Sequence, residues 1–144
     1  MTSLSALDVL ALTLYGEARG EPVEGQIAVA NVIRNRRRDG RWGQTYEGVC
    51  LARLQFSCWS PDGGGANYLK LVKLRELVMA GRMPADAALK ACYGIALALD
   101  QWILDNTHGA THYHTASLHP RPAWAIDEHP IATIGGHLFY RDID

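Results

Sequence analysis

Residues 27 to 33 read Ile27-Ala-Val-Ala-Asn-Val-Ile33, a run that is apolar at every position except Asn31. A helix that carries apolar side chains on nearly all of its faces is buried on all sides. Pro22 suits the first turn of such a helix, and the arginines at positions 34, 36, 37 and 38 suit its C-terminal end, where cations complement the helix dipole. The sequence therefore predicts a helix over residues 23–38 that lies at the centre of the fold.

Apolar spacing predicts three further helices around this one. Ser5 and Asp8 form a capping-box pattern, with aspartate in place of the usual glutamate, before the first of them. The predicted helices cover residues 6–17, 67–80 and 84–104. The stretch between residues 39 and 65 is predicted to be mostly loop, because it ends in Pro61-Asp-Gly-Gly-Gly65.

Beyond Gly109 the pattern changes from helical spacing to alternation. Residues 110–115 are rich in β-formers, and residues 131–134 and 137–140 flank Gly135-Gly136, which is typical of a hairpin with a two-residue turn. The expected fold class is α+β, mainly helical, with a small C-terminal antiparallel β element. The length of 144 residues fits a single domain over residues 1–144.

The charge balance excludes partners that require a strong overall field. Lys and Arg number 14 and Asp and Glu 15, which gives a formal net charge of −1. Such a chain is not drawn as a whole to nucleic acid or to a charged membrane surface. No apolar stretch approaches the roughly 18 residues of a membrane span. We expect a monomer with no nucleic-acid partner and no membrane span.

Three cysteines, Cys50, Cys58 and Cys92, are an odd number and lack the spacing of a metal site. Buried free thiols are therefore predicted, since disulfides are rare in reducing compartments. A bridge between Cys50 and Cys58 stays open as an alternative.

Glu17 is the first candidate for chemistry. It follows Leu10 and Leu14 at helical spacing, so it continues the apolar stripe, and it falls near the negative end of the predicted helix. Desolvation and the dipole both favour the protonated carboxyl there, which suits a general acid. The structural alternative is that Glu17 caps its helix or pairs with Arg19 or Arg34.

Other charged residues flank the predicted helix 23–38. Glu21 and Glu24 precede it and occupy its first turn, so we expect both to satisfy free amides there. The basic patch from Arg34 to Arg41, with Trp42, is interpreted as a solvated helix end. Attraction to an anionic wall polymer is the second interpretation, and contact with nucleic-acid phosphates is the third.

Four segments, in order, resemble the SleB-type cell wall hydrolases, which include spore-cortex-lytic enzymes and phage or prophage lysins. The first runs from Leu14 to Arg36 and contains Gly16-Glu-Ala-Arg-Gly-Glu21. The others are Gln55-Phe-Ser-Cys-Trp59, Asp105-Asn-Thr-His-Gly-Ala-Thr-His-Tyr-His114 and Ile134-Gly-Gly-His-Leu-Phe-Tyr140. The resemblance spans about residues 10 to 141, nearly the whole chain.

The resemblance implies a lysozyme-like, two-lobed fold that acts on peptidoglycan glycan strands without a cofactor. It implies that Glu17 is the catalytic acid. It also implies lytic transglycosylation, in which the muramic 6-hydroxyl attacks its own anomeric carbon after the bond between N-acetylmuramic acid and N-acetylglucosamine breaks. One carboxyl group then suffices, whereas a hydrolytic glycosidase ordinarily uses two. A hydrolytic muramidase is the alternative activity, and a non-catalytic glycan-binding protein is an alternative of a different class.

Amide, hydroxyl and aromatic side chains in two of these segments suit a glycan groove, because sugars combine hydrogen-bonding groups with apolar C–H faces. Core packing is the alternative for the aromatic residues among them, and a packed terminal aromatic is the alternative for Tyr140. The candidate substrate-binding residues are Gln55, Phe56, Ser57, Thr111, His112, Tyr113 and Tyr140.

A zinc site is the rival interpretation of the histidine-rich segment. On a strand, His112 and His114 point to one face, and with His108, His119 or a carboxylate they could bind zinc in an amidase or peptidase. The sequence supplies no characteristic third ligand, so no metal is expected.

The first apolar run has no lysine or arginine before it, unlike a secretory signal. We therefore expect synthesis in the cytoplasm without an export signal of its own. Action on the cell wall would then follow release through a holin or in a particle, as for a phage, prophage or gene-transfer-agent lysin.

Overall fold

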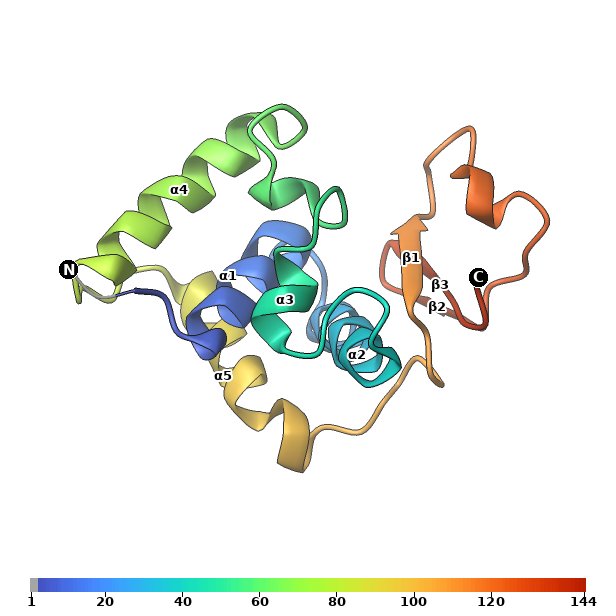
Figure 1. Ribbon diagram of the computed structural model, residues 1–144, viewed down its shortest axis with the longest axis horizontal. Helices are drawn as coiled ribbons and strands as arrows, with labels where there is room; N and C mark the ends of the chain where they lie inside the picture. The colour runs from blue at the N-terminus through green and yellow to red at the C-terminus, as the bar shows by residue number, and fades with distance from the viewer. Residues whose placement is uncertain (1–2) are drawn as a thin grey trace.

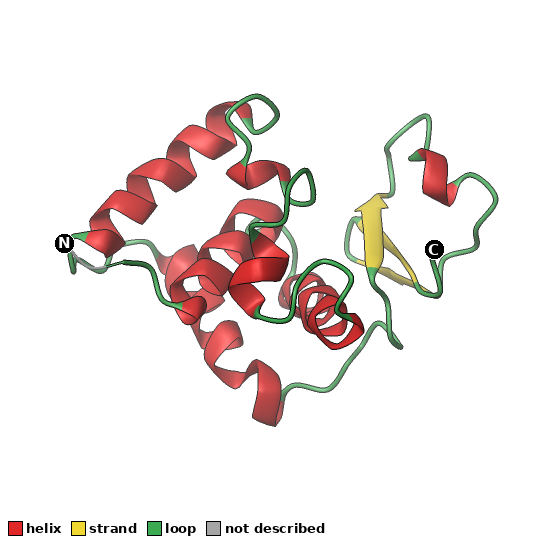
Figure 2. Ribbon diagram, in the orientation of Figure 1, coloured by secondary structure: helices red, strands yellow, loops and turns green. Residues whose placement is uncertain are grey.

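Helices gather on one side of the molecule and strands on the other in the computed structural model, which describes residues 3–144 (Figures 1 and 2). We call residues 6–102 the helical lobe and residues 112–140 the β lobe. The helices are α1 (Ala6–Ala18), α2 (Val23–Asp39), α3 (Tyr46–Cys50), α4 (Gly65–Met79) and α5 (Ala87–Trp102). The strands are β1 (His112–Thr115), β2 (Ala132–Ile134) and β3 (His137–Tyr140), and short 3-10 turns cover Ser57–Trp59 and Ala123–Ala125. The predicted α+β, mainly helical class is confirmed, and no helix in the described part of the chain combines the length and hydropathy needed to cross a bilayer.

Helix α1 lies at the centre of the helical lobe. The predicted capping box is present, because the Asp8 amide donates to Ser5 Oγ at 3.1 Å and the Ser5 amide donates to the Asp8 carboxylate at 2.9 Å. Every residue from Val9 to Tyr15 is buried, and the helix packs against α2, α3, α4 and α5. Within the helical lobe the central helix is therefore α1, and the predicted central helix 23–38 lies between the two lobes.

Helix α2 instead forms the wall between the two lobes. Its residues Val29 and Ile33 belong to the core of the helical lobe, while Ala28 and Val32 pack with Phe139 of β3. Two packed faces explain why the helix is apolar on nearly all sides, so its predicted burial is confirmed.

Local capping accounts for two of the differences between the predicted and the observed helices. Helix α5 begins at residue 87 rather than 84, because the Asp86 carboxylate accepts from the Leu89 amide at 3.0 Å and so caps the helix. The predicted loop contains the short helix α3, where Thr45 Oγ1 accepts from the Gly48 amide at 3.0 Å. Helix α4 begins two residues before the predicted start.

The β lobe is a three-stranded antiparallel sheet in the order β1-β3-β2. The predicted hairpin is confirmed: β2 and β3 are joined by Gly135-Gly136, and Gly135 has a φ of +56° that favours glycine. Strand β1 pairs with the other edge of β3, with His112 opposite Tyr140.

Glu21 does not cap α2, so its predicted role is wrong. The residue at the cap position is Pro22, and no side chain accepts from the first amides of the helix. The Glu21 carboxylate instead accepts from the Gly136 amide in the hairpin turn at 2.7 Å. Glu24 lies in the first turn of α2, where its charge suits the dipole, but its predicted capping role is wrong as well because no side chain caps this helix.

All three cysteines are buried and free, as predicted. Cys58 lies in the 3-10 turn that packs on the last turns of α1. The two segments approach closely at Gly16, where a Cβ atom would lie 2.5 Å from the Cβ of Cys58. Only glycine permits this approach, which brings Cys58 beside the end of the helix that carries Glu17.

Candidate active site

Glu17 lies at the junction of the two lobes. It occupies the last turn of α1 and is half-buried. The Tyr113 hydroxyl, from β1, donates to Glu17 Oε1 at 2.7 Å. Burial, followed by the charge of Glu17, raises the pKa of the nearby Cys58 thiol. The Tyr113 hydroxyl holds the Glu17 side chain in one orientation.

Arg19 and Arg34, the two arginines considered as partners of Glu17, do not pair with it. Arg19 donates to the Tyr15 carbonyl at 3.0 Å and to Asn67 Oδ1 at 2.6 Å. Arg34 is buried and donates to the Leu99 carbonyl. The structural alternative for Glu17, pairing with one of these arginines, is therefore wrong.

Tyr113 is held by aromatic neighbours of the β lobe. Its ring stacks on Phe139 with centroids 5.7 Å apart and meets the His137 ring edge-on at 5.0 Å. Burial raises the pKa of Tyr113 well above 10, and the charge of Glu17 acts in the same direction. Tyr113 is therefore a neutral hydroxyl donor to Glu17 at any pH near neutrality.

Arg36 orients the amide of Gln55. Its guanidinium is 6% exposed and donates to the Thr111 carbonyl at 2.6 Å and to Gln55 Oε1 at 3.1 Å. Its faces lie against the rings of Trp42 and Phe56. Burial lowers the pKa of Arg36 to about 10, so the group keeps its charge at neutral pH. Because arginine only donates, the oxygen of Gln55 faces Arg36 and the amide NH₂ is turned away from it.

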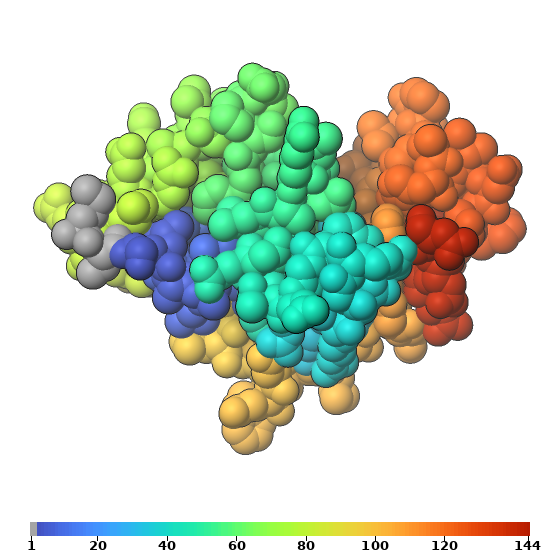
Figure 3. Space-filling model, in the orientation of Figure 1, coloured from blue at the N-terminus to red at the C-terminus, as the bar shows by residue number. Residues whose placement is uncertain are grey.

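A pocket of about 510 Å³ lies between the lobes beside Tyr113. Figure 3 shows the surface hollowed between the green segment that follows α3 and the orange segment that follows β1. Aromatic faces and hydrogen-bond donors dominate its lining, a combination that suits a polar ligand with apolar C–H faces. The lining residues are Arg36, Arg41, Trp42, Leu54, Gln55, His112, Tyr113, Trp124 and Asp144.

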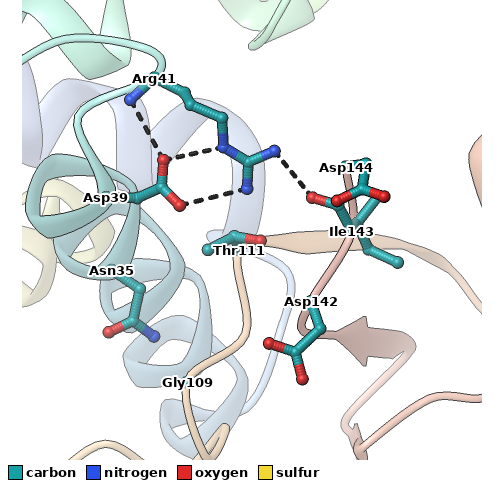
Figure 4. A pocket seen from close by; sticks show the side chains of 8 residues that line it. All are labelled: Asn35, Asp39, Arg41, Gly109, Thr111, Asp142, Ile143 and Asp144. Carbon is teal, nitrogen blue, oxygen red and sulfur yellow. Dashed lines mark hydrogen bonds and ion pairs between the residues drawn. The ribbon is translucent and has the colours of Figure 1, made fainter.

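A second pocket of about 580 Å³ adjoins the first, since Arg41 and Asp144 line both (Figure 4). Arg41 donates to the carboxylate of Asp39 at 2.8 Å and to the Ile143 carbonyl at 2.7 Å. Arg41 therefore ties the segment after α2 to the end of the chain, and it forms the partition between the two pockets.

His112 stands between two tryptophan rings in the first pocket, with centroids 5.3 Å from Trp42 and 4.9 Å from Trp124. Burial, followed by the charges of Arg36 and Arg41, lowers the pKa of His112 to about 4. His112 is thus neutral from about pH 5 upward, whereas an unfolded chain holds its proton up to about pH 6.5.

This difference predicts a pH dependence of stability. A lowered folded-state pKa gives stability that is complete above pH 6.5 and is lost as the pH falls toward 4. We expect wild type to lose about 1 kcal/mol more than His112→Gln between pH 7 and pH 4.5, after allowance for the solvent exposure of the ring. Urea unfolding of both proteins at the two pH values measures the difference. Equal losses in the two proteins would contradict the shifted pKa of His112.

The structure brings some of the predicted substrate-binding residues together and separates others. Gln55, His112 and Tyr113 line one pocket, and the Thr111 carbonyl anchors Arg36 beside it. The other three predicted residues do not line it. Phe56 is 4% exposed beneath Arg36, Ser57 is exposed at the start of its 3-10 turn, and Tyr140 is fully buried and hydrogen-bonded to His114 at 2.8 Å.

Two residues that reasoning from the sequence did not assign to the site are Arg36 and Trp124. The interpretation of the basic patch as a solvated helix end is wrong for Arg36, which is buried. The spacing of Arg36 in the sequence could have indicated its burial, because Arg36 continues the buried stripe of Val29 and Ile33 at helical intervals. Trp124 carried no such signal, because only the tertiary fold brings its loop back to β1.

The histidines of β1 alternate as predicted, since His112 and His114 both contact the Trp124 ring. Tyr113 faces the opposite side of the strand. Within residues 3–144, no group of three or more His, Cys, Asp or Glu side chains is placed to hold a metal ion.

The fold is that of the SleB catalytic domain. The catalytic domain of the Bacillus cereus SleB protein superposes with a TM-score of 0.64 at 26% identity, covering 96% of this chain and 91% of that one. The catalytic domain of the germination-specific lytic transglycosylase SleB from Bacillus anthracis superposes with a TM-score of 0.61 at 26% identity, covering 93% and 92%. The shared class is a mainly helical domain with a small C-terminal sheet.

The chain belongs to the Cell Wall Hydrolase family, whose pattern matches residues 20–140. It is 49% identical over 137 residues to the spore cortex-lytic enzyme of Oceanobacillus iheyensis, covering 95% of this chain and 42% of that protein. It is 30% identical over 131 residues to the spore cortex-lytic enzyme of Bacillus subtilis, covering 91% and 36%. The chain thus spans about two fifths of the length of these curated relatives.

Proposed function

We propose that this chain cleaves peptidoglycan between N-acetylmuramic acid and N-acetylglucosamine as a lytic transglycosylase, with Glu17 as general acid and then general base. The observation that carries the proposal is the hydrogen bond of 2.7 Å from the Tyr113 hydroxyl to Glu17, because Tyr113 also lines the pocket between the lobes. Membership of the Cell Wall Hydrolase family supports the substrate, and the likeness to the Bacillus anthracis catalytic domain supports the reaction.

The first step is acid catalysis. The protonated Glu17 carboxyl gives its proton to the glycosidic oxygen while the bond from that oxygen to the muramic C1 breaks. The N-acetylglucosamine part leaves as an alcohol, and positive charge develops at C1. A positioned general acid contributes about 10²- to 10⁴-fold to such a step.

The second step needs no water. The muramic 6-hydroxyl oxygen forms a bond to C1 and gives its proton to the Glu17 carboxylate. A 1,6-anhydro ring results, and Glu17 is protonated again for the next cycle. One carboxyl group therefore serves both steps, and Tyr113, which donates to Glu17 Oε1, keeps it in place throughout.

The pocket supplies the contacts that hold the sugar. The Gln55 NH₂ group, turned away from Arg36, donates to sugar oxygens or to an acetamido carbonyl. The partly exposed Trp124 ring packs on sugar C–H surfaces.

Digestion of purified peptidoglycan tests the proposal, with the released fragments weighed by mass spectrometry. We expect 1,6-anhydromuramic ends, which are lighter than reducing muramic ends by one water. Reducing muramic ends would instead make the enzyme a hydrolytic muramidase. Cleaved stem peptides with intact glycan strands, abolished by a chelator, would contradict the proposal and favour the zinc amidase. An intact wall that retains the protein would favour a non-catalytic glycan-binding role.

Release to the cell wall through a holin or in a particle stays a prediction. An export reporter fused after the C-terminus of the chain tests it, because secretion of the fusion without a holin would contradict it.

A further inference from the structure

Glu21 links the helical lobe to the β lobe. It lies between α1 and α2, and its Oε1 accepts from the Gly136 amide at 2.7 Å across 115 residues of sequence. The same oxygen lies 3.4 Å from the Nδ1 atom of His137, which is the first residue of β3. One carboxylate therefore contacts both the turn of the hairpin and the strand that follows it.

The hairpin is shaped to receive this carboxylate. A Cβ atom at Gly135 would lie 2.5 Å from Glu21 Oε1, and one at Gly136 would lie 3.3 Å from Oε2. Both glycines thus leave the space that the carboxylate occupies. The Glu21 side chain is 21% exposed and is committed to the hairpin, which sets it apart from an acid that faces a substrate.

A short chain of contacts leads from Glu21 to the proposed general acid. The His137 ring, which is buried, meets the Tyr113 ring edge-on at 5.0 Å, and the Tyr113 hydroxyl donates to Glu17. A shift of the hairpin moves His137, and with it the ring that orients Glu17. Glu17 and Glu21 are four residues apart in the sequence, and the contacts through His137 and Tyr113 form a second connection between them by way of the β lobe.

We propose that Glu21 is a positioning residue that docks the β2–β3 hairpin and thereby holds Tyr113 against Glu17. It rests on the proposed function, since Glu17 must be the acid for its orientation to affect the rate. A misplacement of about 1 Å at a reacting group is enough to cost about 100-fold in rate. The effect should fall on the chemical step and spare substrate binding, because Glu21 does not line either pocket between the lobes.

The test compares three variants in steady-state cleavage of soluble glycan strands, below the melting temperature of each protein. Glu21→Ala removes the acceptor of the Gly136 amide, and we expect kcat to fall about 10- to 100-fold with KM within about twofold. Glu21→Gln keeps an amide oxygen that accepts from Gly136, and it should recover most of that loss. Glu24→Ala is the matched control, because Glu24 is an exposed acid in the first turn of α2, and it should match wild type.

Gly135→Ala provides a second route to the same result. Its methyl group displaces the Glu21 carboxylate, and alanine at a φ of +56° also strains the turn, so kcat should fall at least as far as in Glu21→Ala even though Glu21 is intact. An unchanged kcat in Glu21→Ala would overturn the proposal, and so would a raised KM at constant kcat. Wild type that does not cleave glycan strands would instead overturn the proposed function, so the two failures are distinguishable.

Discussion

Glu17→Gln should lower the rate of glycan cleavage by about 10³-fold while the protein stays folded. Glutamine has nearly the same shape, and its amide oxygen still accepts from the Tyr113 hydroxyl. It has no acidic proton to give to the glycosidic oxygen and cannot take one from the muramic hydroxyl. The variant therefore removes the chemistry and preserves the geometry.

The measurement is the initial rate at which new muramic ends appear from purified peptidoglycan. Glu24→Gln makes the same chemical change on the exposed first turn of α2 and should keep the wild-type rate. Circular dichroism of the three proteins shows whether folding is equal. If Glu17→Gln kept more than about a tenth of the wild-type rate, the assignment of Glu17 as general acid would be wrong.

Gly16→Ala should destabilise the protein by about 1–3 kcal/mol, the usual cost of overpacking a core. The new methyl carbon would lie 2.5 Å from Cys58 Cβ and 2.8 Å from its Sγ, so α1 and the 3-10 turn must move apart. For a chain of this length the melting temperature should fall by about 2–10 °C. Activity should fall as well, because the clash displaces the end of α1 that carries Glu17.

Thermal unfolding of matched variants separates this clash from a general effect of alanine. Gly94, in the middle of α5, has open space around it, so Gly94→Ala should stabilise the protein by about 0.5–1 kcal/mol. In the Gly16→Ala background, Cys58→Gly should restore stability, whereas Cys58→Ala should not, because alanine keeps the clashing Cβ atom. Equal shifts for Gly16→Ala and Gly94→Ala would show that the approach at Gly16 is not tight.

Local patterns in the sequence determined the elements of this fold. The capping box at Ser5 and Asp8, the apolar spacing of the helices and the Gly135-Gly136 turn all depend on residues a few positions apart. Their effects are therefore readable from the order of the residues. Glu17 could be identified from the sequence for the same reason, because an acidic residue on the apolar stripe of a helix is recognisable within that helix.

The tertiary structure alone decided which of these elements meet. Glu21 has the position of a helix cap, yet its partner Gly136 is 115 residues away. Tyr113 and Glu17 are 96 residues apart, and Arg36 joins Thr111 across 75 residues. Such contacts depend on how the packed helices and the sheet are placed in space, and no local pattern identifies the partner of each residue. The sequence thus determined the helices, the hairpin and the candidate acid, while the packing of the β lobe on α2 decided which groups surround that acid.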